Sequence, residues 1–508
     1  MKKRLAILLS ALTAAASLTA CGGSGSSSNN STQSSAAASA AAEQTTAAAP
    51  SAADSAKGSF DGRTDISYMM IYNPDTFDEN AKLNLTQNTG NLSEWISPSS
   101  VRADDMQADA AYTTKAQQDL KEIVGDADLT DLPTDRAGGL IKTYKEGDTQ
   151  SFFYNETKGS FTCLYAGNKC NVWMLSADVS KKDQAIAIGK EFDANIYDKD
   201  VALFGEPRYA DEGGKIQIIF EPMEGNLGGY FMPIELFTTP EALYLNLPAT
   251  GHNYDHAIIH INSVMLGKGQ EVEKLIYSTM AHEFQHLINM SDLFYGNSGK
   301  ITNTWLNEAM SGYAEEKIYP GSKESEYHDM ALMVSERVRH GQSIYNFDND
   351  GEDIGVYGMV YLFSEYLAKN GGEDIFKKIH NAYRTSITDI DDAKAIYDSM
   401  PAAFVSEIDA KYTYPASTVT GTKEQEWLSK LIMDFNLELM AQAQSPFKRL
   451  DKNYLLYDQV APAQLEGGGR IIAPTKSGTF AIPSDAGKPL AYIGLDKDYK
   501  PVTDVVYN

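Results

Sequence analysis

Two histidines four residues apart, with a glutamate between them, are the residues of this chain best suited to metal chemistry. They lie in the segment His282-Glu283-Phe284-Gln285-His286, which has the pattern H-E-x-x-H. On a helix, positions i and i+4 share one face, so both imidazoles can reach one metal ion. Glu283 lies next to that face and can reach a metal-bound water as a general base. The pattern therefore predicts zinc-assisted hydrolysis.

The alternative interpretation is a core helix whose histidines make ordinary hydrogen bonds. The chain has only 8 histidines in 508 residues, so the pattern seldom arises by chance. Apolar residues recur around it at helical spacing, which predicts a buried helix over residues 271–289. These residues are Leu275, Ile276, Met280, Phe284, Leu287 and Ile288.

A catalytic zinc site needs a third protein ligand, and two carboxylates compete for this position. Glu308 lies in a second predicted helix, 304–319, after a glycine-containing loop that allows this helix to fold back. Asp292 stands six residues after His286, where metzincin-like sites place their third ligand after an intervening glycine. Here Asn289 replaces that glycine and tolerates a left-handed turn less well. We therefore favour Glu308.

The predicted helix over residues 271–289, which carries His282 and His286 and is called the metal helix below, is preceded by segments that resemble β-strands. Residues 161–165 and 171–175 flank a plausible hairpin turn, and 216–220, 242–247 and 257–261 read as further strands. After residue 269 helices predominate, and after 446 short strands return. The order of these segments predicts an α+β fold.

Two of the three cysteines are expected to form a disulfide. With Ala166-Gly167 as the turn pair, Cys163 and Cys170 stand directly opposite each other on neighbouring strands. Exported proteins meet oxidising conditions, so we favour the bridge over two buried thiols.

The N-terminus has the features of an export signal. Positions 2–4 are basic, residues 5–16 are mostly apolar, and Leu18-Thr19-Ala20-Cys21 follows. This order resembles the bacterial lipobox, which implies cleavage before Cys21 and a lipid on its sulfur. Residues 22–57 contain almost no side chain that can pack, so they are expected to form a flexible tether. We expect an extracytoplasmic protein, lipid-anchored to a bacterial cell membrane.

Length and charge limit the remaining interpretations. A chain of 508 residues is too long for one compact core. The formal net charge of −26 repels phosphate backbones, so we expect no nucleic acid partner. The sequence predicts a signal peptide at 1–20, the tether at 21–58 and an N-terminal domain or pro-region at 59–150. A catalytic domain at 151–420 and a helix plus β-rich C-terminal module at 421–508 follow.

The metal-site motifs resemble those of a known peptidase group. Ala281–Asn289, together with Thr304-Trp-Leu-Asn-Glu308 and Tyr313-Ala-Glu315, is most similar to the hyicolysin-type neutral metallopeptidases of the gluzincin group. The resemblance implies a zincin-like catalytic domain with a mixed sheet, the metal helix and a helical subdomain. It also implies a zinc cofactor, ligands at His282, His286 and Glu308, and Glu283 as the base.

Two further roles are suggested by this resemblance. Gluzincins often carry a carboxylate four residues after the third ligand, but this chain has Gly312 there; Glu315 is either its substitute or a surface charge. A Tyr or His stabilises the oxyanion in related enzymes, and Tyr357 is our candidate, ahead of His328 and His380.

These observations predict a surface-anchored zinc endopeptidase that acts on proteins or peptides. The alternatives are a zinc aminopeptidase and a non-catalytic surface-binding lipoprotein with an inactive zincin domain. His252, His256 and His260 would share a face of a continuous strand. We expect them to be hydrogen-bonded strand histidines rather than ligands of a second metal.

Overall fold

The structure is a computed structural model, and it describes only part of the chain. The described ranges are 60–75, 81–83, 142–154, 157–207, 214–295, 300–321, 341–345, 354–441 and 463–507, without 61, 179, 224–227, 249, 301, 389, 416–417, 476–479 and 483–487. The predicted signal peptide, Cys21, the tether and His328 lie outside the described residues.

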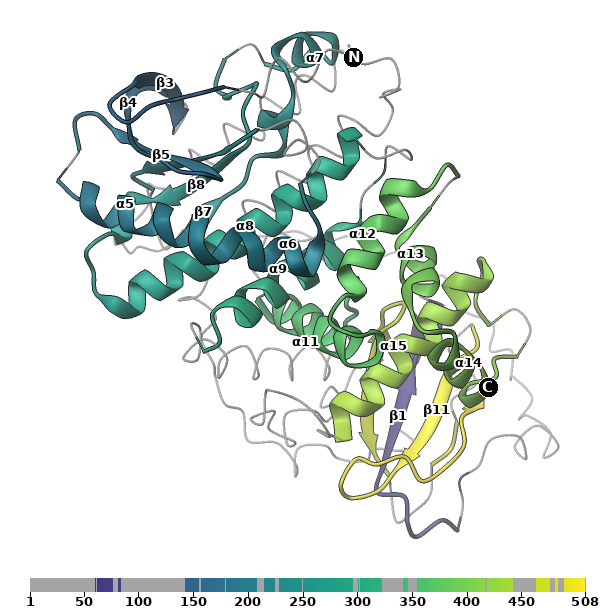
Figure 1. The fold of residues 1–508 in the computed structure, drawn as a ribbon. Coiled ribbons are helices and arrows are strands. Elements are labelled where there is room, and N and C mark those ends of the chain that lie inside the picture. The colour runs from purple at the N-terminus through teal and green to yellow at the C-terminus, as the bar shows by residue number, and fades with distance from the viewer. Residues whose placement is uncertain are drawn as a thin grey trace, which may run out of the picture. The chain divides into compact units, whose positions relative to one another are not determined.

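A mixed six-stranded sheet forms the first part of the fold, in the order β3-β4-β5-β6-β8-β7 (Figure 1). The inner strands β5, β6 and β8 run parallel, and the pairs β3–β4, β4–β5 and β7–β8 are antiparallel. The bounds are Thr149–Tyr154 for β3, Thr157–Ala166 for β4, Cys170–Leu175 for β5, Ile216–Glu221 for β6, Gly229–Tyr230 for β7 and Ile258–Asn262 for β8. This mixed sheet with its helices agrees with the predicted α+β class.

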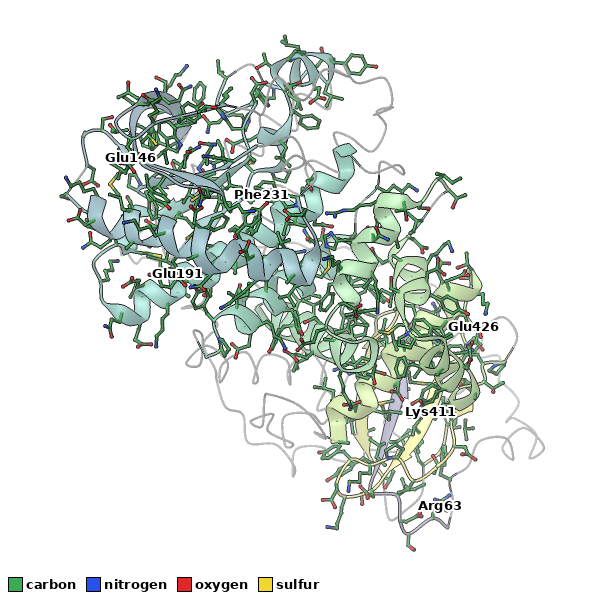
Figure 2. The ribbon with its side chains drawn as sticks, viewed as in Figure 1. Arg63, Glu146, Glu191, Phe231, Lys411 and Glu426 are labelled. Atoms are coloured by element: carbon green, nitrogen blue, oxygen red, sulfur yellow. The ribbon has the colours of Figure 1, made fainter. Side chains whose placement is uncertain are left out.

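Helices cover one face of this sheet. These are α5 (Lys182–Glu191) and the 26-residue α8 (Gln270–Tyr295), visible beside the sheet in Figure 1, and α6 (Tyr197–Phe204) packs on α8. Ile218 and Ile259 on the strands share a buried cluster with Phe284 on α8. Phe231, just after β7, is fully buried in the same cluster (Figure 2). Side chains alternate along a strand, so the neighbouring residues Ile219 and Ile258 point to the other face of the sheet.

The opposite face of the sheet has its own apolar cluster. It contains Phe152, Phe161, Cys163, Trp173, Ile219 and Ile258.

A short helix, α7 (Thr239–Tyr244), forms in place of the strand predicted over 242–247, and that prediction is wrong. Its first turn is fixed by a capping box in which Thr238 and Glu241 satisfy each other's backbone N–H groups.

The predicted disulfide is also wrong, because both thiols are free and buried. The hairpin turn lies two residues later than predicted: Gly167 N donates to Cys170 O at 2.9 Å, so Asn168 and Lys169 form the turn. A bulge also shifts the register, and Cys163 pairs with Trp173. Cys163 and Cys170 therefore belong to clusters on opposite faces of the sheet. Burial raises the pKa of the Cys163 thiol to about 11, so it stays protonated and unreactive.

After α8 the chain is mainly helical. Helix α9 (Thr304–Ile318) packs against α8 and against α11 (Ile354–Gly371). The helices that follow are α12 (Ile375–Thr385), α13 (Asp392–Ser399), α14 (Ala402–Lys411) and α15 (Lys423–Ala441). Within the described part of the chain, no helix combines the length and the apolar character needed to cross a membrane.

The C-terminal strands form a second sheet around a strand from the start of the described chain. Its order is β10-β1-β11-β12, with bounds Arg470–Pro474, Tyr68–Tyr72, Ala491–Leu495 and Val506–Tyr507. Two further strands, β2 (Ala81–Leu83) and β9 (Ala463–Leu465), also pair across the same long separation. The start of the predicted 59–150 region thus shares a sheet with the predicted C-terminal module. A cleavage that released β1 as a pro-region would remove an inner strand of this sheet.

Helix α15 joins this second sheet to the helical part. Tyr72 of β1 donates its hydroxyl to Ser429 O at 2.9 Å. Lys411, labelled in Figure 2, forms an ion pair with Asp434 of α15. Glu426, also labelled, pairs with Lys430 within α15. The predicted domain boundaries otherwise remain predictions.

Candidate metal centre

Helices α8 and α9 bring the three predicted ligands together. Nε2 of His282 lies 3.5 Å from Oε2 of Glu308, and Nε2 of His286 lies 3.6 Å from the same oxygen. One potential ligand atom from each of the three residues lies within 4.8 Å of the others. The histidines are one helical turn apart, which places both rings on the face of α8 that α9 covers.

The donor set and its spacing fit a zinc ion. Ligand atoms about 2.0–2.1 Å from a tetrahedral zinc lie roughly 3.3–3.4 Å from one another. The two histidine–glutamate separations are close to this value. All three residues are buried, and Nε2 of His286 makes no hydrogen bond within the described residues. A buried nitrogen lone pair facing a buried carboxylate across this distance is well suited to sharing a cation.

Burial and the nearby charges shift the pKa values of the two histidines in opposite directions. Burial alone lowers the pKa of His282, but the charges of Glu315, Glu308 and Glu283 outweigh burial and raise the pKa to about 10. For His286, burial dominates and lowers the pKa to about 4. The neighbouring carboxylates therefore favour a positive charge at this position, which a divalent cation also provides.

Glu315 contacts the outer nitrogen of the first histidine. Its Oε1 forms a short hydrogen bond with Nδ1 of His282. Glu315 stands seven residues after Glu308 on α9, two turns along the same helical face. The bond leaves Nε2 of His282 directed at Glu308 and fixes the tautomer a metal ligand needs. Of the two readings of Glu315, the structure favours the substitute for the carboxylate absent at Gly312.

Replacing Glu315 with glutamine is expected to weaken zinc binding about 10–100-fold, because the neutral amide no longer orients and polarises His282. Zinc affinity measured by competition with a coloured chelator checks this result. Glu316→Gln is the matched control, since the Glu316 carboxylate accepts from Gly321 N instead. Equal zinc affinity in both variants would show that Glu315 does not support the site.

The other predicted residues fall differently. Helix α8 continues to Tyr295, so the chain does not make the turn after Asn289 on which the choice of Asp292 depends. Glu308 as third ligand remains a prediction, supported by its distance from both histidines. Tyr357 lies half-buried on α11, packed against the large core cluster. Its role at the oxyanion remains a prediction, and His380 is buried on α12.

Asp200 is a buried acid near this site that the sequence did not indicate. It lies on α6, which packs against α8 and α9, and it is fully buried. Neither carboxylate oxygen has a hydrogen-bond partner among the described residues. Burial raises the pKa of Asp200 well above its usual value, partly offset by the charge of His282. Only the packing of α6 on the metal helix reveals this residue, because nothing in its local sequence marks it.

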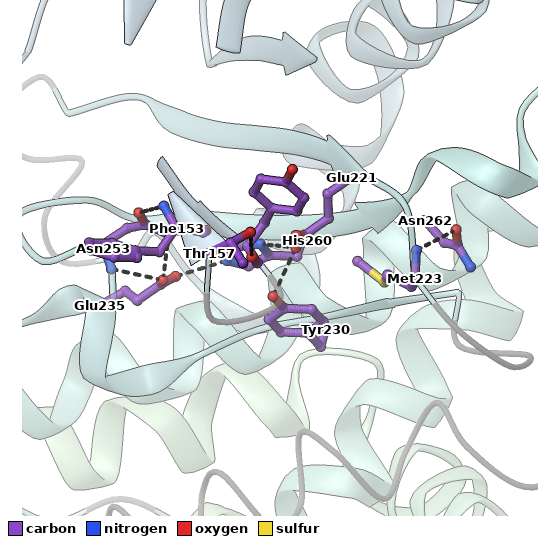
Figure 3. Close-up of polar contacts among 10 residues, drawn as sticks. Phe153, Thr157, Glu221, Met223, Tyr230, Glu235, Asn253, His260 and Asn262 are labelled. Carbon is purple, nitrogen blue, oxygen red and sulfur yellow. Dashed lines mark hydrogen bonds and ion pairs between the residues drawn. The ribbon is translucent and has the colours of Figure 1, made fainter. Parts of the chain in front are cut away.

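His260 belongs to a separate buried polar network (Figure 3). Its Nδ1 lies 2.7 Å from Glu221 Oε1, and its Nε2 lies 3.0 Å from Glu235 Oε2. Tyr230 stacks on the imidazole and donates to Glu221 Oε1 at 2.8 Å. His260 is thus a hydrogen-bonded strand histidine, as expected. His252 precedes the strand β8, so the three histidines do not share one strand.

The His260 network is expected to make the free energy of unfolding depend on pH. Burial lowers the pKa of His260, but Glu235 and Glu221 raise it from 6.5 to about 10. Since the folded pKa lies above the unfolded value, this stabilisation is complete below pH 6.5 and is lost as pH rises towards 10. The loss is on the order of 3–5 kcal/mol.

Urea unfolding of the wild type and of His260→Gln, measured from pH 6.5 to 10, tests this dependence. The difference between the two proteins should shrink as pH rises, since only the wild type loses the ion pair. A difference that stays constant across this range would contradict a charged His260 in the folded protein.

Comparison with known proteins adds an independent observation. No protein-family model matches the chain. It is 31% identical over 231 residues to the neutral metalloprotease ShpI of Staphylococcus hyicus, which is 42% of this chain and 49% of that protein. The chain therefore spans about half the length of this curated relative. At a coarse level, the similarity supports a metalloprotease, and the centre on α8 and α9 has the residue types that such an enzyme requires.

Proposed function

We propose that this chain is a zinc metallo-endopeptidase that hydrolyses internal peptide bonds in proteins or peptides. The observation that carries the proposal is the buried cluster of His282, His286 and Glu308, with Glu283 on the same helix. The similarity to a neutral metalloprotease supports the same reaction class.

The three ligands would hold zinc at the junction of α8 and α9. Zinc, when bound, supplies a Lewis acid that polarises the scissile carbonyl and lowers the pKa of a nearby water. Two neutral imidazoles and one carboxylate leave a bound zinc with a net positive charge and an open position. Glu315 keeps His282 in the orientation that this ligand set requires.

Glu283 performs the proton transfers in this proposal. It follows His282 directly on α8 and is 2% exposed, and its charge acts on that histidine. Its carboxylate takes a proton from the attacking water and passes it to the leaving amine. Tyr357 is proposed to donate a hydrogen bond to the oxyanion of the tetrahedral intermediate.

Two peptide substrates test the proposal against its main alternative. The first is an internally quenched peptide with blocked ends, and the second is a short peptide with a free N-terminus and a C-terminal reporter. Cleavage of the first, at an internal bond and dependent on zinc, supports an endopeptidase. Cleavage of the second alone would indicate an aminopeptidase, and cleavage of neither with zinc bound would favour the non-catalytic binding role.

We also propose that the protein is lipid-anchored through Cys21 on the outer side of a bacterial cell membrane. The support is the order of basic, apolar and lipobox-like segments before Cys21. Cells that express the wild type should incorporate a labelled fatty acid into the protein, whereas cells that express Cys21→Ser should not. Equal labelling of both would remove the basis for the anchor.

A further inference from the structure

A pocket lies beside strand β3, away from the metal centre. It has a volume of about 310 Å³ and is lined by the β3 strand, helix α7 and the segment 247–256. Phe152 in its wall belongs to the cluster on the sheet face that α8 does not cover. None of the three metal-ligand residues lines the pocket. It is therefore a separate site on the molecule.

The pocket is cationic, although the chain as a whole carries a net charge of −26. Lys142 and Lys158 line it, and neither forms an ion pair with a carboxylate in the described chain. Nζ of Lys142 lies 3.4 Å from His256 Nε2, and Nζ of Lys158 lies 5.2 Å from the ring centre of Phe153. Both ammonium groups keep donors free for an anion.

The acidic residue among the described lining residues is already engaged. Asp255 accepts from Thr239 N at 3.0 Å and from Thr239 Oγ1 at 2.6 Å. These hydrogen bonds hold the start of α7, and a single carboxylate cannot neutralise both lysines. Burial lowers the pKa of Lys142, and the charge of Asp255 offsets this only in part, so a further anion beside this lysine would stabilise its charged form.

One wall of the pocket is apolar and reaches the surface. Leu247 is buried, whereas Leu243 on α7 is 63% exposed and also lines the pocket. The neighbouring Tyr244 is 49% exposed. An apolar side chain held at the rim of a cationic pocket gains stability when an apolar ligand group covers it.

The pocket wall is held in place by hydrogen bonds. Asn253 accepts from Phe153 N at 2.7 Å and donates to Phe153 O at 3.0 Å, as a neighbouring strand would. Asn253 also donates to Glu235 Oε1 at 2.9 Å, which joins the wall to the His260 network (Figure 3). A wall fixed in this way needs little rearrangement to accept a ligand.

We propose that this pocket binds an organic carboxylate that carries an apolar group. The carboxylate is recognised by Lys142 and Lys158, and the apolar group covers Leu243 and Leu247. A free carboxylic acid and the C-terminus of a peptide both present this chemistry. Inorganic phosphate has the charge but lacks the apolar group, so it should bind weakly.

Calorimetric titration of the metal-free full chain tests the proposal, because without metal a carboxylate cannot bind at the zinc site. The probes are 3-phenylpropionate, its neutral amide, inorganic phosphate, and the dipeptide Gly-Phe with a free or amidated C-terminus. We expect 3-phenylpropionate to bind at least 10-fold more tightly than its amide and than phosphate. Tighter binding of free Gly-Phe than of 3-phenylpropionate assigns the pocket to peptide C-termini, and the reverse order assigns it to free acids.

Three variants establish where the probe binds. Lys142→Met should weaken 3-phenylpropionate binding at least 10-fold. Lys378→Met is the matched control, because Lys378 pairs with Asp374 on the surface. This variant should bind 3-phenylpropionate as tightly as the wild type does. Leu243→Ser, at an exposed position that does not threaten folding, should weaken 3-phenylpropionate binding, while the binding of acetate, titrated as a further probe without a large apolar group, should stay unchanged. The proposal is overturned if acid and amide bind equally, if phosphate binds as tightly as 3-phenylpropionate, or if both Lys142→Met and Leu243→Ser bind like the wild type.

Discussion

The Glu283→Gln variant is expected to retain zinc and to lose turnover by roughly 100–10,000-fold. Glutamine keeps the size of the side chain and its place on α8, next to His282, but it cannot accept the proton of the attacking water. Glu283 is not among the three clustered ligands, so the metal affinity should change little. Cleavage of the quenched peptide and zinc content by elemental analysis, measured on the same preparation, check both parts.

The matched control for this variant is Glu271→Gln, on the exposed first turn of the same helix. It removes one negative charge from α8 far from the ligands along the chain and should cleave like the wild type. Joint loss of zinc and turnover in Glu283→Gln would show that Glu283 maintains the site rather than transferring protons. Unchanged turnover would refute the proposed base.

The Glu308→Gln variant is expected to lose zinc as well as turnover. Apparent zinc affinities of about 10–16 kcal/mol, shared by four ligands, give roughly 2.5–4 kcal/mol for each ligand, or about 70–1000-fold in affinity. Removing Glu308 also removes the carboxylate that lies 3.5–3.6 Å from both imidazoles. The glutamine amide fills the same space between the two histidines but offers them no negatively charged ligand.

Zinc affinity by chelator competition and peptide cleavage at increasing zinc concentration measure this effect. High zinc should partly restore cleavage in Glu308→Gln but not in Glu283→Gln, because only the first defect is one of binding. Treating the wild type with a chelator should abolish cleavage, and added zinc should restore it. Wild-type zinc affinity in Glu308→Gln would mean that the third ligand lies elsewhere.

Local features of the fold followed directly from the sequence. The spacing of His282 and His286 determines that they share a helical face, because the periodicity of a helix is local. The α+β class followed from the order of strand-like and helix-like segments. Another local prediction failed because a few hydrogen bonds determined whether the segment formed a helix or a strand. The segment 242–247 has apolar residues like a strand, but the capping box at Thr238 begins a helix before it.

Strand pairing was not determined by the sequence. The register of Cys163 and Cys170 depends on where the turn lies and on one bulge, and either change moves a side chain to another partner or face. Strand β1 pairs with β10 and β11, about four hundred residues further along the chain. Nothing local in the sequence records such a partner, since pairing energy depends on which strands the whole fold brings together.

The sequence by itself determined that His282 and His286 lie on one face of a helix with Glu283 beside them, because this arrangement depends on a single helical turn. It reduced the third ligand to Glu308 or Asp292, and the tertiary structure supports Glu308, which has a potential ligand atom within 4.8 Å of those of both histidines. Only the tertiary structure placed Glu315 on His282 and Asp200 beside the same helix. Those contacts depend on how α9 and α6 pack against α8, and packing of distant segments is set by the whole core rather than by spacing along the chain.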